Sequence, residues 1–473
     1  MIRIQKTKNI LGILFFSLLS VSCQEWLDVS PSTEVKYDDL FSYKNGFKDQ
    51  LTGVYTALCS ENLYGVELGF GMLDVLGQQY YLWSAAANGP YYNLHRFEYD
   101  NSRIEATINT IWTDMYNAVA NVNILLQGLA DHRGVLAENE EKIYEGEAYA
   151  LRAFLHFDLL RLFGKSYVSG ADEKAIPYVK AISKKVTPLS TVSEVLDMVA
   201  GDLEKAAALL EEDPIKTGQA TTSFLGTRSF HLNYYAVRAL LARVYLYKND
   251  KVNALKNARE VILSEKYPWV SKGAVATSDR KDRDGIFLPE CIWMLNNTRL
   301  KTLTETYLKE SDNTLYCNGS VIDEIFESQT YGGLDWRYIY YFERPDWYWL
   351  SNKLYQYTTS AYNNRQPLLR LSEMYLIAAE CATSKKEAVE YLNTLRQHRG
   401  FEESHNLKEN VADEYLQTAI GKEYRKEFIG EGQWFYYCKR TDQAVLPNVT
   451  VPFSKTYYVL PIPEQEKEYG NRN

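Results

Sequence analysis

Residues 146–167 read GEAYALRAFLHFDLLRLFGKSY, and this stretch decides the fold class. Apolar residues recur along it at steps of three and four, at Leu151, Phe154, Leu155, Leu159 and Leu162. That period places them on one face of an α-helix, which must be buried against other elements. Arg152, Asp158 and Arg161 lie off this face, and Gly164 follows the last periodic residue, where helices commonly end on a left-handed cap. The stretch therefore predicts a core helix of a mainly α protein.

The same period recurs on both sides of this stretch. It predicts a short helix over Gly46–Leu58 and a long helix over Arg103–Leu129. Thr191-Val-Ser-Glu194 has the spacing of a capping box and predicts the start of another helix. Residues from Val411 to Gly432 return to a helical period.

Two stretches have the pattern of helical hairpins. Asn233–Ser264 is periodic except for a turn at Asn249-Asp250, and Arg370–Gly400 is periodic except for a turn at Ser384. Each unit spans about 34 residues with small residues where the arms cross, which is typical of tetratricopeptide repeats. The sequence thus predicts a scaffold of about four tetratricopeptide-like helix pairs.

Two long stretches lack a helical period. Glu61–Asn101 is rich in glycine and tyrosine, and its aromatic content argues against disorder. Lys266–Pro367 contains glycine, asparagine, aspartate and aromatic residues. We expect it to form loops and short strands that pack on the helical scaffold.

Composition excludes some classes of function. The net charge of -9 over 473 residues argues against a nucleic-acid partner, because no excess of cations is present to neutralise phosphates. The 38 tyrosines suit a wet binding surface, although most must serve helix packing. The cysteines show no C-x-x-C spacing, so we expect no structural zinc and mostly free, buried thiols.

The first residues have the pattern of a secretory signal. Basic residues precede an apolar run, Ile10–Val21, that is too short to span a bilayer. Ser22 then precedes Cys23, as in a lipoprotein cleavage site. We predict a signal peptide over 1–22 and lipidation of Cys23. A simple cleaved signal with an unmodified cysteine remains the alternative.

Beyond these patterns, the letters of several segments resemble the SusD/RagB family. The 146–167 helix is similar to the family pattern A-E-A-x-x-L-R-A-x-x-x-F-D-L-x-R-x-F-G. Residues 23–31, CQEWLDVSP, are similar to its start, and Pro461-Ile-Pro463 to its end. KEYRKEFIGEGQWFYYCKR at 422–440 is similar to a further motif, but Trp434 replaces the usual arginine and Tyr437 the usual aspartate.

The resemblance implies a surface lipoprotein of the outer membrane that delivers glycans to a SusC-like TonB-dependent transporter. It also implies four tetratricopeptide-like pairs and binding without catalysis. On this basis we expect a single SusD-like domain over 23–473. Its helical scaffold would cover about 40–265 and 368–432, and a loop-rich ligand region about 266–367.

The sequence lacks the common motifs of catalytic sites. We find no G-x-S-x-G elbow, H-E-x-x-H or P-loop, and we expect no cofactor and no enzyme activity. We assign no metal ligands, and the sequence does not decide whether a metal is bound. Glu423, Glu427 and Glu431 share a helix face at steps of four. Paired carboxylates occur in glycosidases, but basic residues surround these three, so we interpret them as ion pairs.

Sugar rings need aromatic platforms with hydrogen-bonding groups nearby. Two irregular stretches, around 79–93 and 335–349, offer both. The resemblance implies that they converge at one shallow site. The candidate ligand-binding residues are Tyr81, Trp83, Tyr92, Trp336, Tyr338 and Trp347. We predict glycan capture at the cell surface; a peptide-binding relative and a surface-anchored glycan hydrolase are the alternatives.

Overall fold

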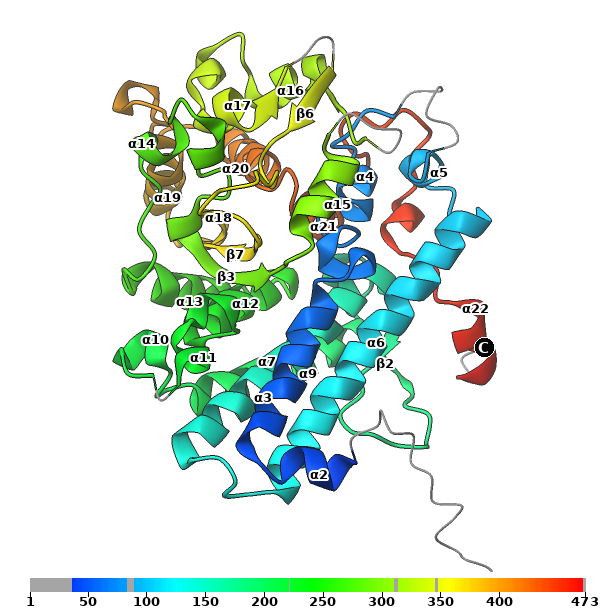
Figure 1. Cartoon of the computed structure of the whole chain (residues 1–473). Helices are drawn as coiled ribbons and strands as arrows, with labels where there is room; N and C mark the ends of the chain where they lie inside the picture. Colours follow the sequence, from blue (N-terminus) through cyan, green and yellow to red (C-terminus); the bar gives the residue numbers. More distant parts are fainter. Residues whose placement is uncertain (1–35, 83–88, 221, 310–313, 345–347, 471–473) are drawn as a thin grey trace, which may run out of the picture.

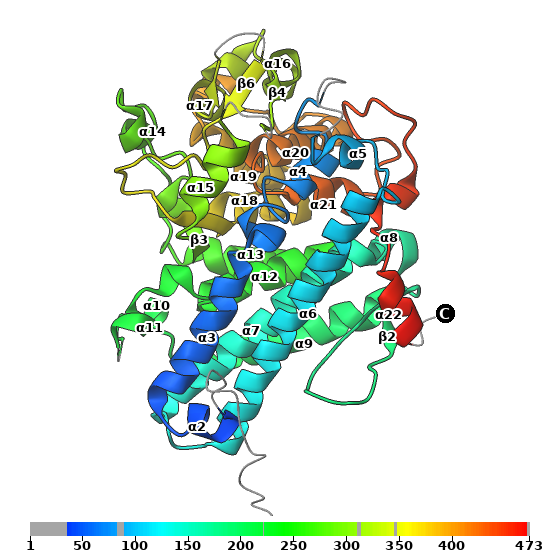
Figure 2. The same ribbon diagram turned by 45° about the vertical axis from the view of Figure 1, so that its right-hand side comes forward.

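The computed structural model describes residues 36–82, 89–220, 222–309, 314–344 and 348–470, which form a mainly α protein (Figures 1 and 2). Its scaffold helices are α3 (Lys44–Leu58), α6 (Ser102–Asp131), α7 (Glu138–Phe163), α9 (Val192–Leu209), α12 (Tyr234–Tyr247), α13 (Lys251–Leu263), α18 (Leu371–Cys381) and α19 (Lys385–Gln397). Packing runs from α3 to α6, α7, α9, α12, α13, α18 and α19 in turn. The predicted mainly α fold is confirmed. The assignment of the pairs as tetratricopeptide-like units stays a prediction.

The other helices lie before, between and after these scaffold helices in the chain. In the N-terminal half they are α2 (Tyr37–Phe41), η2 (Glu61–Gly65), α4 (Met72–Leu76), α5 (Tyr92–His95), α8 (Tyr167–Gly170), α10 (Pro214–Thr217), α11 (Ser223–Gly226) and η4 (Arg228–Phe230). In the C-terminal half they are α14 (Lys272–Val275), η5 (Arg280–Asp282), η6 (Leu288–Glu290), α15 (Leu300–Tyr307), α16 (Gly319–Phe326), η7 (Tyr331–Leu334), α17 (Trp336–Tyr340), η8 (Glu403–His405), α20 (Asp413–Glu427), α21 (Gln433–Arg440), η9 (Lys455–Tyr458) and α22 (Glu464–Tyr469).

Three small antiparallel sheets lie on this scaffold. β1 (Lys174–Pro177) pairs with β2 (Leu189–Thr191), and β3 (Cys291–Asn296) pairs with β7 (Arg365–Arg370). β6 (Tyr348–Ser351) is the centre of the third sheet, between β4 (Cys317–Asn318) and β5 (Phe342–Glu343). The expected short strands of the loop-rich region are thus present. The helices α14 to α17 in the same region were not predicted, because elements of eight residues or fewer are too short to establish a helical period.

α7 is the central helix, and every residue from 150 to 163 is buried. The polar residues off its predicted apolar face are therefore buried too, and each has a partner. Arg152 pairs with Asp202 at 2.7 Å, and Arg161 Nε donates to Asp158 at 3.0 Å. Asp158 also accepts the hydroxyl of Tyr64 at 2.7 Å. Such pairing is needed because an unpaired charge in the protein interior is costly.

The predicted left-handed cap at Gly164 is wrong. This residue has φ -101° and ψ 165°, which is extended backbone. A Cβ at Gly164 would lie 2.8 Å from Leu160 Cδ1 and 2.9 Å from the Cβ of Ala175 in β1. Glycine is therefore required here for the close approach of β1, and not for a positive φ.

His156 of α7 is fully buried between two backbone groups. The amide of Val179 donates to Nε2 at 2.9 Å, so Nε2 must be the acceptor nitrogen. Nδ1 then carries the proton and donates to the carbonyl of Arg152 at 2.8 Å. Burial, assisted by the nearby Arg152 charge, lowers the pKa of His156 to about 4.

We expect His156 to make the fold sensitive to acid. Its folded pKa lies below the unfolded value of about 6.5, so the unfolded chain binds more protons between these limits. Its contribution is fully present above pH 6.5 and is lost as the pH falls towards 4, by roughly 2–3 kcal/mol. Denaturant unfolding at pH 7 and pH 4.5 measures the loss. It should be smaller in His156→Gln, and equal losses in both proteins would contradict the assignment.

The predicted turns and caps of the scaffold are confirmed. Between α12 and α13, Asn249 adopts φ 62° and the Asp250 side chain accepts the amide of Asn253 at 3.1 Å. Ser384 caps α19 by accepting the amide of Glu387 at 3.3 Å. The capping box of Thr191 and Glu194 opens α9.

The predicted helix over 411–432 ends earlier than expected. α20 stops at Glu427, and Gly430 and Gly432 follow with φ of 82° and 69°. The amides of both glycines donate to the buried carboxylate of Asp74. Asp74 lies 356 residues before Gly430 in the chain. Burial, opposed by these two hydrogen bonds, raises the pKa of Asp74 to about 7. The turn is thus dictated by a distant carboxylate that local periodicity cannot report.

The predicted ion pairing of Glu423, Glu427 and Glu431 is confirmed, but the predicted common helix face is wrong for Glu431, because α20 ends at Glu427. Glu427, on the last turn of α20, accepts hydrogen bonds from Arg337 at 2.8 Å and from Arg399 at 2.8 and 3.0 Å. It also pairs with Arg370, the last residue of β7, which directly precedes α18. All four side chains are fully buried. We call this group the Glu427 cluster.

Further pairs extend the Glu427 cluster. Arg337 also pairs with Asp335 and Glu423, both at 2.6 Å, and Arg399 pairs with Glu290 at 2.6 Å. Lys353 pairs with Glu431 at 2.6 Å. Glu290, Asp335, Arg337 and Lys353 belong to the loop-rich region, whereas the other charges belong to the helical part. The cluster therefore ties the loop-rich region to the scaffold.

Three further features of the described ranges concern the thiols, membrane-spanning helices and metal-binding groups. Cys59, Cys291, Cys317, Cys381 and Cys438 are free thiols, and all but Cys59 are buried, as predicted. In these ranges no helix combines the length and apolarity needed to cross a bilayer. The same residues contain no group of three or more histidine, cysteine or acidic side chains with metal-binding geometry.

Candidate functional site

The two irregular stretches that the sequence singled out lie at one end of the molecule. In both views α4 and α5 lie at the upper end together with α16, α17 and β6, whereas α2 lies at the lower end (Figures 1 and 2). The described parts of the two stretches can therefore contribute to one surface.

Tyr81 marks the point at which the first stretch reaches the surface. All residues from 63 to 80 are buried, and Tyr80 is 4% exposed. Tyr81 is 38% exposed. Most of this irregular excursion is thus core, which explains its high aromatic content without a ligand.

Tyr316 connects the two stretches. The amide of Tyr81 donates to the carbonyl of Tyr316 at 2.7 Å. The Tyr316 ring contacts the Tyr348 ring edge to face, with centroids 4.7 Å apart. We call Tyr81, Tyr316 and Tyr348 the tyrosine surface. None of the three residues is buried.

The pairing of β4 with β6 explains why Tyr348 points outward. Asn318 lies opposite Tyr348, and Cys317 lies opposite Trp349. Successive side chains of a strand face opposite sides, so Trp349 points inward and is 9% exposed. Gly319 allows this, because a Cβ there would lie 2.8 Å from Trp349 Nε1.

Arg344 covers the ring of Tyr338, one of the predicted ligand-binding residues. Its guanidinium lies 4.3 Å from the Tyr338 ring centre and 4.2 Å from that of Trp349. The Tyr338 hydroxyl donates to Asp323 at 2.6 Å, and burial together with this contact raises the pKa of Tyr338. Tyr338 is thus engaged on its ring face and at its hydroxyl, while Arg344 is exposed.

Trp336 and Tyr92 have other surroundings. Trp336 is half-buried and lies against Gly400 beyond the end of α19, where a Cβ would lie 2.6 Å from its ring. Its amide donates to the carbonyl of Arg399 at 2.8 Å. Tyr92 is half-buried on α5, with the Arg96 guanidinium 5.8 Å from its ring centre.

Three of the predicted functional residues, Trp83, Trp347 and Cys23, lie outside the described residues. In the chain, Trp83 follows Tyr81 by two positions and Trp347 directly precedes Tyr348.

Sequence reasoning missed Tyr316 and Arg344. Tyr316 stands in a short irregular segment, NTLYCNGS at 313–320, that contains a single aromatic residue. Only the pairing of β4 with β6 brings it beside Tyr348. Its neighbours Leu315 and Cys317 carry no signal of a binding surface, so nothing in the sequence favoured its selection.

The tyrosine surface combines two kinds of group that a sugar requires. A tyrosine side chain has a flat apolar ring and a polar hydroxyl, and the exposed Arg344 adds a guanidinium that can donate hydrogen bonds. The carboxylate beside this surface, Asp323, is engaged by Tyr338 and by the Ser328 hydroxyl at 2.8 Å. The chemistry is therefore that of a binding site for polar rings.

Comparison with known protein families gives two matches. A family described as "Starch-binding associating with outer membrane" matches residues 25–246, and the family described as "SusD family" matches residues 328–448. A similar curated protein is SusD-like protein P38 of Formosa agariphila, which is 23% identical over 93% of this chain and 93% of its own length.

Solved structures share the fold. A SusD superfamily protein of Bacteroides thetaiotaomicron has 20% identity, covers 92% of this chain and 98% of its own, and superposes with a TM-score of 0.71. The surface glycan-binding protein A of the same species, solved in complex with laminarihexaose, has 18% identity and a TM-score of 0.67. It covers 90% of this chain and 98% of its own.

Proposed function

Because this chain belongs to the SusD/RagB family, we propose that it is a cell-surface protein that captures a glycan and passes it to a SusC-like TonB-dependent transporter. The tyrosine surface is the observation that supports glycan capture most directly. It presents tyrosines that are not buried and hydrogen-bonding groups at one end of a rigid scaffold. A structural neighbour with a bound glucan oligosaccharide supports the ligand class.

In this proposal Trp83 and Trp347 extend the tyrosine surface, because each is close in the chain to one of its members. Tryptophan offers a larger apolar face than tyrosine, so both would add stacking area. Tyr92, Trp336 and Tyr338 belong to the same end of the molecule and complete the proposed residue set.

We propose that the protein is held at the outer membrane by lipid on Cys23. The signal pattern of residues 1–22 supports this, as does the description of the matching family as associated with the outer membrane. More than one acyl chain gives firm anchoring, whereas one chain binds only marginally.

Affinity electrophoresis of the purified protein in gels containing single polysaccharides tests glycan capture. We expect one polysaccharide to retard the protein. Trp83→Ala/Tyr348→Ala should lose the retardation, because each stacking ring contributes roughly tenfold in affinity. Trp336→Ala should weaken it less, since that ring lies against Gly400.

Tyr43→Ala is the matched control. Tyr43 is 48% exposed and lies between α2 and α3, at the opposite end of the molecule (Figure 1). It should be retarded like the unaltered protein. Retardation that persists in the double variant would contradict the proposed site, and no retardation by any polysaccharide would contradict glycan capture.

A further inference from the structure

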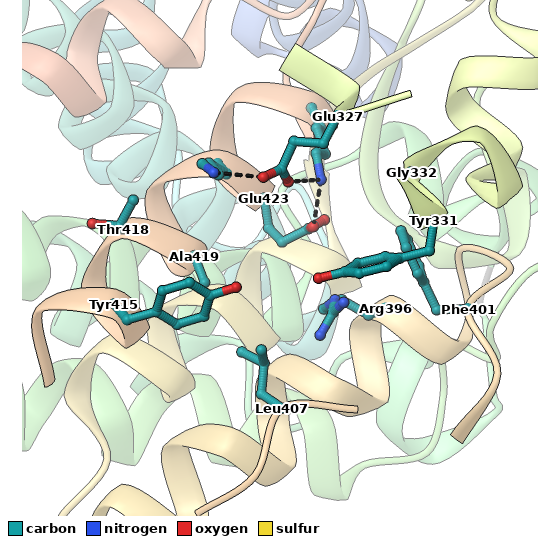
Figure 3. Close-up of a pocket in the computed structure, with 12 residues that line it drawn as sticks. Glu327, Tyr331, Gly332, Arg396, Phe401, Leu407, Tyr415, Thr418, Ala419 and Glu423 are labelled. Atoms are coloured by element: carbon teal, nitrogen blue, oxygen red, sulfur yellow. Dashed lines mark hydrogen bonds and ion pairs between the residues drawn. The ribbon is translucent and has the colours of Figure 1, made fainter. Parts of the chain in front are cut away.

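A small pocket lies between the loop-rich region and the last scaffold helices (Figure 3). α19 contributes Arg396 to it, η7 contributes Tyr331, and α20 contributes Tyr415. Phe401 and Leu407, which follow α19, complete its apolar wall. We call it the Arg396 pocket.

Most charges around the Arg396 pocket are already paired with one another. Glu327 pairs with Lys422 at 2.6 Å and with Lys426 at 3.7 Å. Glu423 pairs with Lys426 at 3.1 Å and with Arg337 of the Glu427 cluster at 2.6 Å. In Figure 3 the ion pairs that Glu327 and Glu423 make with the two lysines form a row along one wall of the pocket.

Arg396 is the exception. Its side chain is 94% buried, being 6% exposed, yet its Nη1 has no hydrogen-bond partner among the residues that the structure describes. The guanidinium lies 4.9 Å from the Phe401 ring centre and 6.0 Å from that of Tyr331. In Figure 3 it points into the space between Tyr331, Tyr415 and Leu407.

A guanidinium nitrogen without a hydrogen bond in this position is costly, because a buried charged group normally has all its donors satisfied. The nearby Glu423 does not supply a hydrogen bond to Arg396, because its oxygens accept from Lys426 and Arg337. Lys426, Arg337 and Arg396 together overcome the effect of burial and lower the pKa of Glu423 to about 2. Counting both glutamates against Arg396, Lys422 and Lys426 leaves one positive charge at the pocket. The pocket therefore lacks one anion.

The size of the pocket restricts that anion. It encloses about 30 Å³, whereas one water needs roughly 10–15 Å³ on the same measure. A planar group of two or three heavy atoms fits, and a complete sugar ring does not. A carboxylate has this size and matches the two parallel N–H groups of a guanidinium.

The entrance of the pocket suits a ring attached to the carboxylate. Tyr331 and Tyr415 are 39% and 49% exposed, and their hydroxyls face each other across the opening (Figure 3). Their rings offer apolar faces and their hydroxyls offer hydrogen bonds to the rim of a sugar.

From these observations we infer that the Arg396 pocket binds the carboxylate of a sugar acid, with Arg396 forming a two-pronged ion pair and the two tyrosines flanking the sugar ring. This site is separate from the tyrosine surface. Gly319, the first residue of α16, lies against Trp349, the chain neighbour of Tyr348 in the tyrosine surface. Glu327, which lines the Arg396 pocket, follows the last residue of α16. The eight residues of α16 separate the two sites by about 12 Å. Neither proposal depends on the other.

Isothermal titration calorimetry of the purified protein with D-glucuronate, D-glucose, acetate and sulfate tests the inference. We expect D-glucuronate to bind at one site and acetate to bind more weakly. Arg396→Met, which keeps the apolar stem, should weaken D-glucuronate binding by about tenfold to a hundredfold, as expected for loss of a charge-assisted pair. Arg133→Met is the matched control, because it removes the same charge from an exposed pair with Glu141 and should leave binding unchanged.

Tyr415→Ala provides a second test that does not remove a buried side chain. It should weaken D-glucuronate binding but leave acetate binding unchanged, since acetate has no ring. Trp83→Ala/Tyr348→Ala should still bind D-glucuronate, and Arg396→Met should still be retarded by a neutral polysaccharide; these results separate the two sites. Equal binding by D-glucuronate and sulfate, unchanged binding in Arg396→Met, or no binding of any carboxylate at millimolar concentration would overturn the inference.

Discussion

Glu427→Gln is expected to destabilise the protein by about 3–5 kcal/mol, the largest effect of any single polar substitution proposed for this protein. Glutamine has the same shape but carries no charge. Arg337, Arg370 and Arg399, all fully buried, would each lose a charged partner. The arginines keep Asp335, Glu423, Glu290 and Glu431 as partners, but the cluster loses the one carboxylate that all three share. Removing a charge from a buried ion-pair network costs this much because the medium has a low dielectric. The midpoint of denaturant unfolding at pH 7 measures the effect.

Asp197→Asn is a suitable control for Glu427→Gln. Asp197 pairs with Lys248, but its side chain is 60% exposed, so water replaces the lost partner. An exposed ion pair contributes about 0–1 kcal/mol, and we expect a change within that range. A loss of less than about 1 kcal/mol in Glu427→Gln would contradict the role assigned to the Glu427 cluster.

Leu159→Ala is expected to cost about 2–5 kcal/mol through the cavity that it leaves in the core. Leu159 is 0% exposed, at the centre of the stretch of α7 in which every residue is buried. Neighbouring helices contact α7 on several sides, so no single element can move to fill the space. Denaturant unfolding at pH 7 gives the free-energy change.

Leu263→Ala makes the same chemical change at the surface. Leu263 is 77% exposed at the last residue of α13, and its replacement should change stability by less than about 0.5 kcal/mol. The comparison isolates the effect of burial, because both leucines are helical. Similar losses in the two variants would show that α7 is not the centre of the core.

Together these effects describe what the scaffold contributes to the proposed function. The stacked helices hold α4 and the β4–β6–β5 sheet at one end of the molecule, and the Glu427 cluster fastens the loop-rich region to the helices. The backbones of Tyr81 and Tyr316 are joined by a hydrogen bond and Tyr348 is paired with β4, so these residues would need less ordering when a glycan binds. Rigid presentation of this kind preserves affinity that flexible loops would lose.

The local structure of the helices could be predicted from the sequence because its causes are local. A period of three and four residues marks the buried face of α7, and the side chains of Thr191, Asp250 and Ser384 mark where helices begin. The resemblance of the 146–167 helix and of 422–440 to family motifs is likewise legible in the letters. So was the pairing of Glu423, Glu427 and Glu431 with basic residues, although not the identity of their partners.

The candidate sites were predicted less well, for a reason that particular residues make clear. Tyr81 and Tyr348 are joined through Tyr316, which is 235 residues from the first and 32 from the second in the numbering of the chain. Tyr338 has the composition expected of a sugar platform, yet Arg344 covers its ring. Exposure of one ring face depends on neighbours that local spacing does not specify.

The sequence by itself determined the helical class, the hairpins, their caps and the family, because each follows from contacts within a few turns or from contiguous motifs. Only the tertiary structure decided which charges meet. Arg399 reaches Glu290 across 109 residues, and Arg337 reaches Glu427 across 90. It also left Nη1 of Arg396, three residues from Arg399, without a hydrogen-bond partner among the described residues. Long-range packing sets these distances, and the strength of an ion pair depends on distance and burial rather than on the order of residues in the chain.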